Sequence, residues 1–331
     1  MHMTWRIRFL TSALIVMLVT CTAVAAEYGA RAYGMGGAYN ALSSDVTGLA
    51  YNPAGLGRRS FDVLLSVGSP DQGIWGKLRS ALDSPADLGQ NYDAAGLAAV
   101  GIGPVAVGFL VDGKYEITED NDNKVIDTRL NQRISLGTGL NVVSFPLSAG
   151  ELRMGLRLQR IDAKHRRFVV DANDSKVTET AWNGAGYSLG VGALAQITEM
   201  VTVGITVHDL LAKTHWTGTT SSQGVTIEED PYTENHTAVT GGSLAIRVPF
   251  TGVTLAIDGD TTGTVRYGAE SNFLFNALSL RAGQTRPRSG PVITTAGLGV
   301  NLGPLSGGIA VGARESFEAL DMFLVDAAIR F

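Results

Sequence analysis

The sequence predicts an all-β protein, a 14-stranded antiparallel transmembrane β-barrel with an N-terminal plug segment in the lumen. Three observations carry this prediction: a secretory leader, repeated short segments of alternating apolar and polar residues, and an alternating last strand that ends on Phe331. Mean hydropathy is +0.13, yet beyond the leader no apolar run reaches the roughly 18 residues of a spanning helix. Such a chain can still cross a membrane as a closed barrel, in which all backbone polar groups are paired.

Residues 1–26 have the pattern of a signal peptide. Arg6 and Arg8 precede the apolar stretch 10–19, and Ala23 to Ala25 offer a cleavage site. The stretch is too short to span a bilayer, which disfavours the alternative of an N-terminal membrane anchor. Its removal takes away the single cysteine and two arginines, and changes the formal charge from −5 to −7. The mature chain would then have no disulfide, and its charge argues against a nucleic-acid partner.

The barrel itself is predicted from 60 to 331. Charged residues are only 17% of the chain, against about 25% in ordinary soluble domains. One strand face is rich in Leu, Val and Ile, and the other is rich in Gly, Ser and Thr, which suits lipid outside and a polar lumen inside. The alternative, a soluble sandwich, would carry many more exposed Lys and Glu residues. The predicted strands are 60–68, 94–101, 105–112, 131–144, 150–161, 182–196, 199–209, 237–248, 252–260, 264–272, 277–285, 293–302, 305–314 and 321–331.

Short and long connections alternate between these strands. We expect the short ones to be periplasmic turns and the longer ones, at 69–93, 113–130, 161–181 and 210–236, to be outer loops. Both chain ends then lie on the periplasmic side. Within the first long loop, Ile74, Trp75, Leu78 and Leu82 have helical spacing and predict a short amphipathic helix at the lipid interface or the barrel mouth.

Aromatic residues fall near predicted outer strand ends. Trp182, Trp216 and Tyr187 have positions that suit an aromatic girdle, and ordinary loop or strand positions are the alternative. At the other end of the chain, Phe323, Val325, Ile329 and Phe331 share one face of the last strand. This pattern resembles the terminal signal of outer-membrane barrels, and it predicts outer-membrane lipid and the barrel-assembly machinery as partners.

The segment 27–59 precedes the first strand and is rich in small residues. A 14-stranded barrel is too wide for Gly, Ser and Thr side chains to fill, so we expect this segment to lie in the lumen as a plug. Pro53 fixes a turn after Asn52. The motif residues of the plug are Gly34, Met35, Gly36, Gly37, Ala38, Asn52, Pro53, Ala54 and Gly55.

These motifs resemble the start of the FadL-type and PorV/PorQ-type outer-membrane barrels, with the PorV/PorQ branch closer. The resemblance covers about thirty residues strongly and the remainder through strand count and the terminal Phe331. It implies a 14-stranded barrel with the N-terminal segment in the lumen, in the outer membrane of a diderm bacterium. It implies one of two functions. The first is passive uptake of hydrophobic or amphipathic small molecules. The second is a non-enzymatic adaptor that binds secreted proteins or envelope partners.

Catalytic and metal-binding motifs are weak in this sequence. Gly186 to Gly190 matches the Gly-x-Ser-x-Gly pattern, but it falls within a predicted strand and not at a strand-to-helix turn. Asp120 to Asn123 resembles the start of a calcium loop without its later glycine and glutamate. The histidines lack metal-ligand spacing, and His208 is expected in the lumen. We therefore predict no enzymatic activity, no cofactor and no metal.

Inward-facing arginines are the remaining candidates for a site. Arg153, Arg157, Arg247 and Arg281, with Arg330, fall on predicted lumen positions, where Asp258, Glu270 and Asp326 are possible partners. They can form an ion-pair network that ties the plug to the wall. Alternatively they can hold the carboxylate of an amphipathic ligand, because guanidinium groups bind carboxylates with two parallel hydrogen bonds.

Overall fold

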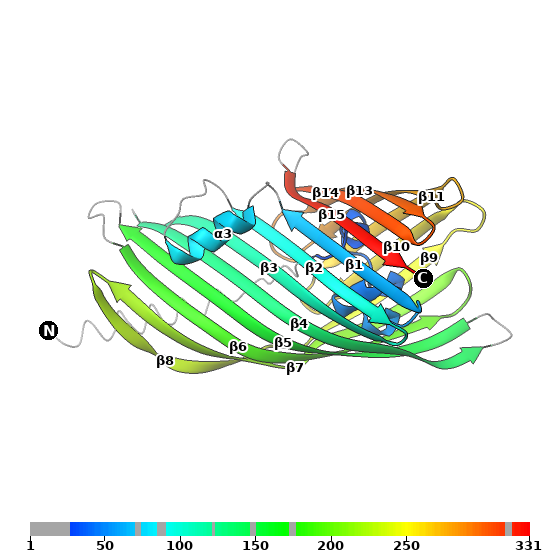
Figure 1. Ribbon diagram of the computed structural model, residues 1–331. Helices are drawn as coiled ribbons and strands as arrows, with labels where there is room; N and C mark the ends of the chain where they lie inside the picture. The colour runs from blue at the N-terminus through cyan, green and yellow to red at the C-terminus, as the bar shows by residue number, and fades with distance from the viewer. Residues whose placement is uncertain are drawn as a thin grey trace.

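The barrel is seen in a computed structural model, which describes residues 27–69, 74–84, 91–120, 123–145, 150–171, 177–314 and 320–331. The predicted signal peptide lies outside these residues. One antiparallel sheet closes on itself, because β1 pairs with β15 and β6 pairs with β7 (Figure 1). The strands are β1 (Phe61–Ser69), β2 (Tyr92–Ile102), β3 (Val105–Asp120), β4 (Asn123–Phe145), β5 (Gly150–Asp171), β6 (Val177–Gln196), β7 (Val201–Ser222), β8 (Val225–Asn235), β9 (Val239–Arg247), β10 (Val253–Asp260), β11 (Val265–Phe273), β12 (Leu278–Arg286), β13 (Ile293–Leu302), β14 (Leu305–Arg314) and β15 (Leu320–Arg330).

The closed wall has fourteen strand positions. β9 pairs with the first half of β7, from Val201 to His208, and β8 pairs with its second half, from Lys213 to Ser222. β8 and β9 therefore follow one another along the same side of β7 and share one position in the ring. The predicted 14-stranded antiparallel barrel is confirmed.

Three of the predicted long outer loops are wrong. Most of the residues at 113–130, 161–181 and 210–236 belong to β3 through β8, which project far beyond the short strands β9–β15 (Figure 1). The reason is physical: where these outer strand segments meet water on both faces, polar residues occupy both faces and the apolar alternation disappears. β8 shows this well, with Glu228, Glu229 and Asp230 in succession.

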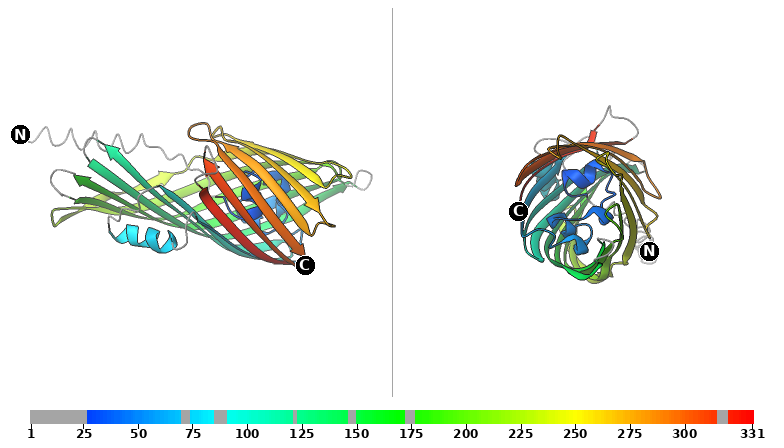
Figure 2. Two further views of the ribbon diagram at one scale, coloured as in Figure 1. Left: turned by 90° about the horizontal axis from the view of Figure 1, so that it is seen from above. Right: turned by 90° about the vertical axis from the view of Figure 1, so that its right-hand side faces the viewer.

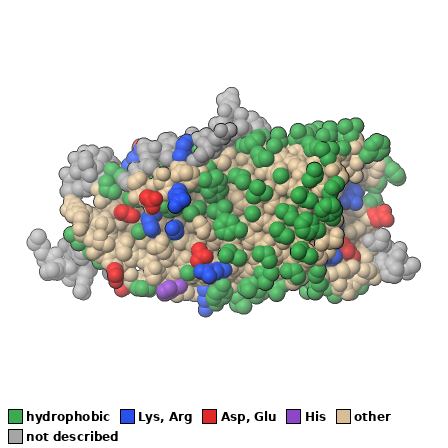
Figure 3. Space-filling view, viewed as in Figure 1, with side chains coloured by type: hydrophobic (Ala, Val, Ile, Leu, Met, Phe, Trp, Pro, Cys, Tyr) green, Lys and Arg blue, Asp and Glu red, His purple; other side chains and the backbone are tan. Residues whose placement is uncertain are grey.

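The barrel wall has an apolar outer face and a small, polar inner face. On β5 the outward Met154, Leu156 and Leu158 are about half exposed, whereas the inward Arg153 and Arg157 are buried. The outward hydrophobic side chains form a continuous band on the face seen in Figure 3. On β15 the outward residues are Phe323, Val325 and Ile329, with Phe331 just beyond the strand. The band has the location expected for lipid contact.

The helix α3 (Ile74–Asp83) lies on the outer side of the barrel wall (Figure 2). Its buried side chains Ile74, Leu78 and Ala81 pack on outward residues of the long strands, among them Tyr115 and Phe168. The predicted amphipathic helix is present, and it covers the wall between the apolar band and the projecting strand ends. Among the described residues, no helix is long and apolar enough to cross a membrane.

Residues 28–56 pass through the barrel lumen, as the end-on view in Figure 2 shows. They contain the helix α2 (Ala30–Gly34) and three short 3-10 helices, η1 (Asn40–Leu42), η2 (Val46–Leu49) and η3 (Pro53–Gly55). Asn52 begins η3: its side-chain oxygen accepts from the Ala54 N–H at 3.0 Å, and Pro53 occupies the first helical position. Nearly all of these residues are buried. We refer to 27–59 as the plug.

Candidate functional site: the plugged lumen

A row of three glycines forms the seat for the Asn52–Pro53 turn. Gly139 on β4 lies opposite Gly155 on β5, which lies opposite Gly192 on β6. A Cβ atom at Gly155 would be 2.1 Å from the carbonyl carbon of Pro53, and one at Gly192 would be 2.0 Å from the Asn52 side-chain oxygen. Only glycine permits this approach. The Asn52 amide also donates to the Ala193 carbonyl at 3.1 Å, so the turn is bonded to the backbone of β6.

A second glycine seat holds the other end of the plug. Gly268 on β11 pairs with Gly283 on β12, and Cβ atoms there would collide with the Met35 backbone. Gly36 and Gly37 have φ of 61° and 71°, a backbone region that favours glycine. Wall hydroxyls complete the contact, because Thr285 donates to the Gly36 carbonyl at 2.7 Å and Thr295 accepts from the Gly36 N–H at 3.0 Å.

Two predicted arginines bond directly to plug carbonyls. Arg153 donates to the carbonyls of Ala54 and Leu56 at 3.0 and 2.7 Å. Arg157 donates to the Leu49 carbonyl at 2.8 Å and contacts His208 Nδ1 at 2.9 Å. The side chains of Arg153 and Arg157 are both buried. Both guanidinium groups thus bond to the plug, although the buried Nε of Arg157 has no hydrogen-bond partner among the described residues.

Arg281 joins a buried ion-pair cluster with the plug. Glu270 accepts from Arg281 at 2.8 Å and from the plug residue Arg31 at 2.7 and 2.9 Å. Arg330 makes a similar link at the other side, to Asp45 of the plug at 3.0 Å and to Asp62 of β1 at 3.3 Å. Arg247 differs: it is exposed at the end of β9, next to the turn that leads to β10, and no described plug residue is bonded to its side chain.

Wall carboxylates also cap backbone N–H groups of the plug, which the sequence reasoning did not anticipate. Asp258 accepts from Tyr39 and Asn40 at 3.0 and 2.9 Å, Asp326 from Ala30 at 2.8 Å, and Asp62 from Val46 at 2.8 Å. Asp258 and Asp326 were expected to pair with arginines, and they bind backbone instead. Short helical segments leave several N–H groups without intrahelical partners, and these carboxylates supply the acceptors.

A polar layer closes the outer side of the plug. The Tyr28 hydroxyl donates to Asp112 at 3.0 Å, and Arg133 contacts both groups, at 3.2 Å to the hydroxyl and 2.8 Å to Asp112.

Three further polar residues belong to the plugged lumen and its wall. His208 lies in the lumen, as expected. Burial raises the pKa of the plug's Glu27 carboxyl to about 7, even though Arg266 lies 3.8 Å away and opposes the shift. Ser188 of the Gly-x-Ser-x-Gly run lies in the middle of β6, where it bonds to Asp209.

An aromatic cluster lines the inner face of the projecting strands. Trp182 on β6 and Trp216 on β7 both contact Tyr232 on β8, with ring centroids 5.2 and 6.4 Å apart. Trp216 lies opposite Gly184, and Trp182 lies opposite Gly218, so glycines make room for the indoles. The two tryptophans share the inward face with Ser188 and therefore do not form part of a lipid-facing girdle. Tyr187 alone of the three faces outward, half exposed.

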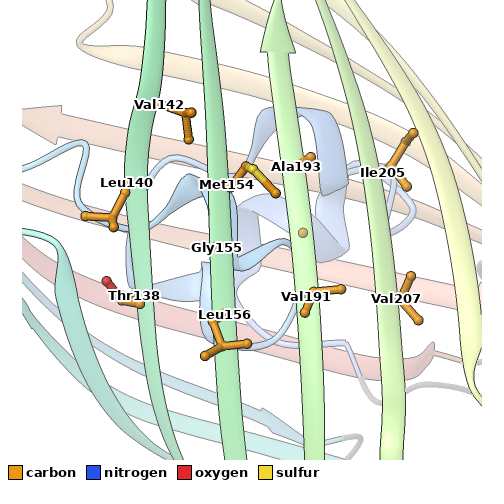
Figure 4. A pocket seen from close by; sticks show the side chains of 11 residues that line it. Thr138, Leu140, Val142, Met154, Gly155, Leu156, Val191, Ala193, Ile205 and Val207 are labelled. Carbon is orange, nitrogen blue, oxygen red and sulfur yellow. The ribbon is translucent and has the colours of Figure 1, made fainter.

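An open apolar depression of about 420 Å³ lies on the outer, lipid-side face of β4–β7 (Figure 4). Met154, Leu156, Val191 and Ile205 line it, and its floor includes Gly155 and Gly192. The same glycines contact Asn52 and Pro53 on the lumen side. At this place a single layer of backbone separates the plug from the outer face.

No protein-family model matches the sequence, and no curated protein sequence matches it. Solved structures do match. The toluene transporter TbuX of Ralstonia pickettii has a TM-score of 0.64 at 12% identity, over 93% of this chain and 98% of its own. The P. putida toluene transporter TodX scores 0.58 at 12% identity, over 92% and 98%. A Pseudomonas aeruginosa FadL homologue scores 0.56 at 11% identity, over 92% and 99%. The fold is therefore the FadL-like barrel.

Proposed function

We propose that the protein is an outer-membrane channel for the passive uptake of small hydrophobic or amphipathic molecules. The observation that carries the proposal is the thin wall at Gly155 and Gly192, with the plug turn on one side and an apolar depression on the other. An apolar molecule gains free energy by moving from the lumen into lipid, in proportion to the apolar surface removed from water. Structural neighbours described as toluene transporters support the same reading.

The proposed path begins at the aromatic cluster. Trp182, Trp216 and Tyr232 offer apolar faces to a ligand that enters the mouth, and their polar edges stay hydrated. The polar layer around Arg133 then disfavours further axial movement of an apolar molecule, because its buried polar groups would lose their partners. Displacement of the Asn52–Pro53 turn from the glycine row frees space beside this part of the wall. Exit into the membrane then requires the strands themselves to separate there, because Gly139, Gly155 and Gly192 are paired in a continuous ladder.

In this proposal Arg153, Arg157 and Arg281 anchor the plug and do not hold a ligand carboxylate. Their guanidinium groups already bond to plug carbonyls or to Glu270. A ligand carboxylate would have to displace these bonds. Replacement of Arg153 and Arg157 by Ala should thus loosen the plug and leave fatty-acid affinity within about twofold, a change of roughly 0.4 kcal/mol.

The adaptor function is the second candidate. The strands β3–β8 project beyond the apolar band, and β8 exposes Val225, Ile227 and Tyr232. Such a surface suits a protein partner as well as a small ligand. A ligand-binding experiment separates the two, because only uptake requires a saturable site for small hydrophobic molecules.

Quenching of tryptophan fluorescence tests the proposal. In a Trp75→Phe variant the tryptophans of the mature chain are Trp182 and Trp216, whereas the Trp182→Phe/Trp216→Phe variant keeps only Trp75 on the outer helix. We expect bromotoluene or a dibrominated fatty acid to quench the first variant saturably. The second variant should show only the linear quenching that detergent partitioning gives. Linear quenching in both variants would contradict uptake and favour the adaptor function.

A further inference from the structure

The outer face of β5–β7 changes abruptly from apolar to cationic within one row of residues. Leu158, Leu189 and Leu211 lie side by side across the three strands and end the apolar band. The next outward row consists of Arg160, Tyr187 and Lys213, all exposed. Successive outward rows are about 7 Å apart along a strand, so the cations begin directly above the lipid-facing leucines.

A second depression, of about 400 Å³, opens beyond that row, toward the projecting strand ends. The polar side chains of Asp162, Lys164, Asn183 and His215 line it together with the apolar Leu130, Ala163 and Ala185. It lies on the outer face of β4–β7, the same strands that carry the apolar depression, and is closer to their projecting ends. Figure 3 shows charged side chains and a histidine next to the edge of the hydrophobic band, over the strands at the lower side of the view.

The charges on β5–β7 around this depression are mainly positive and incompletely paired. The outward face of these strands carries four cations, Arg160, Lys164, Arg166 and Lys213, and two carboxylates, Asp162 and Glu179. A third carboxylate, Glu228 of β8, lies beside Thr219 in the row of Arg166. Arg160 contacts Asp162 at 3.4 Å with 72% of its side chain exposed, and Arg166 lies 3.9 Å from Glu179. Lys164 and Lys213 have no carboxylate partner within the part of the chain that the structure describes. Cationic donors of this kind bind phosphate through strong, short hydrogen bonds.

We propose that this face binds a phosphorylated lipid of the outer leaflet. Arg160, Lys164 and Lys213 would bind the phosphate, Tyr187 would lie at the headgroup level, and an acyl chain would lie over the apolar rows toward Met154 and Leu156. A cationic headgroup site directly above an apolar surface matches the two halves of such a lipid. The inference concerns the outer face alone and does not depend on transport through the lumen.

Native mass spectrometry of the detergent-purified protein tests the site. The probes are lipid A with both phosphates and the same lipid after its phosphates are removed. We expect the phosphorylated form to be retained about tenfold better, since charge-assisted hydrogen bonds distinguish the two. Equal retention would overturn the proposal in favour of a general lipid annulus. Displacement of lipid A by millimolar inorganic phosphate would overturn it in favour of a free-anion site.

Substitutions locate the site on the barrel. The Arg160→Gln/Lys164→Gln/Lys213→Gln variant should lose the preference for the phosphorylated lipid. Lys213→Gln alone, a single exposed change, should weaken it severalfold even if the triple variant assembles poorly. The matched control is Arg286→Gln, because Arg286 is an exposed residue on the opposite wall, where it contacts Tyr267. The assignment would be contradicted if the folded Lys213→Gln and triple variants kept the full preference for phosphorylated lipid A. It would also be contradicted if Arg286→Gln lost that preference to the same extent.

Discussion

Gly155 on β5 and Pro53 in the plug approach so closely that a Cβ atom at position 155 would lie 2.1 Å from the Pro53 carbonyl carbon. Both partners are backbone, so neither can yield by a simple side-chain rotation. The Gly155→Val substitution should therefore displace the Asn52–Pro53 turn and raise single-channel conductance in planar bilayers. The matched control is Gly242→Val, because nothing lies within 4 Å of a Cβ atom there. Equal conductance of the two variants would show that the contact does not hold the plug.

Deletion of 30–50 removes α2 and the anchors at Asp45 and Arg31. We expect the deleted form to insert, because wall strands bond to one another, and to conduct ions better than the intact protein. Planar-bilayer recording measures this directly. If the deleted form inserts and conducts no better, the segment does not block the lumen.

Glu270→Gln breaks the cluster that joins Arg31 to Arg281. Glu270 is 3% exposed, so its loss leaves two guanidinium groups without their shared anion. Removal of one partner of a buried pair costs about 3–5 kcal/mol, and partial exposure of Arg31 places this case near 3 kcal/mol. Denaturant unfolding in lipid vesicles measures the change. Lys114→Gln is the control, since the pair of Lys114 with Glu116 is about one-third exposed and is worth about 0–1 kcal/mol. A matching result for both variants would refute the anchor.

Deletion of Phe331 should impair assembly in the outer membrane. Phe331 is 65% exposed and contacts Phe61 of β1 with ring centroids 6.0 Å apart, so it lies where the barrel closes. The fraction of heat-modifiable protein in outer-membrane extracts is the readout. Phe275→Ala is a suitable control, because Phe275 is fully exposed in a turn. Wild-type levels of the truncated protein in the outer membrane would show that Phe331 is not needed for assembly.

The membrane-embedded strands were predictable because one face of each meets lipid and the other face meets the lumen, which produces a regular alternation of residue types. Leu152 to Leu158 on β5 shows the pattern well, and the register later places the arginines between these residues in the lumen. The projecting strands were not predictable by the same signal, since water lies on both sides of segments such as β8. The space for the inward Trp182 indole depends on the register that places Gly218 opposite it. The period-two pattern does place Trp182 on the face of Gly184 and Ser188, so the inward orientation could have been predicted, whereas its partner Gly218 could not.

The plug was predictable as a segment of small residues that fills a wide lumen. Its contacts were not, because they join residues far apart in the chain, in some cases by more than two hundred positions, such as Arg31 with Glu270 and Ala30 with Asp326. The hydrogen bonds of Asp258 and Asp326 to plug N–H groups show the limit of prediction from the sequence. An inward carboxylate can pair with arginine or with a free N–H group, and only the three-dimensional structure distinguishes the two.

The most direct test of the proposed uptake is the initial rate at which cells take up radiolabelled toluene and a labelled long-chain fatty acid at low micromolar concentration. Host cells without hydrocarbon channels of their own would carry the intact protein, the Trp182→Ala/Trp216→Ala variant, or an empty vector. We predict that the intact protein raises the rate for at least one of these ligands and that the variant raises it less. A rate equal to that of the empty vector, with heat-modifiable protein in the outer membrane, would contradict the account.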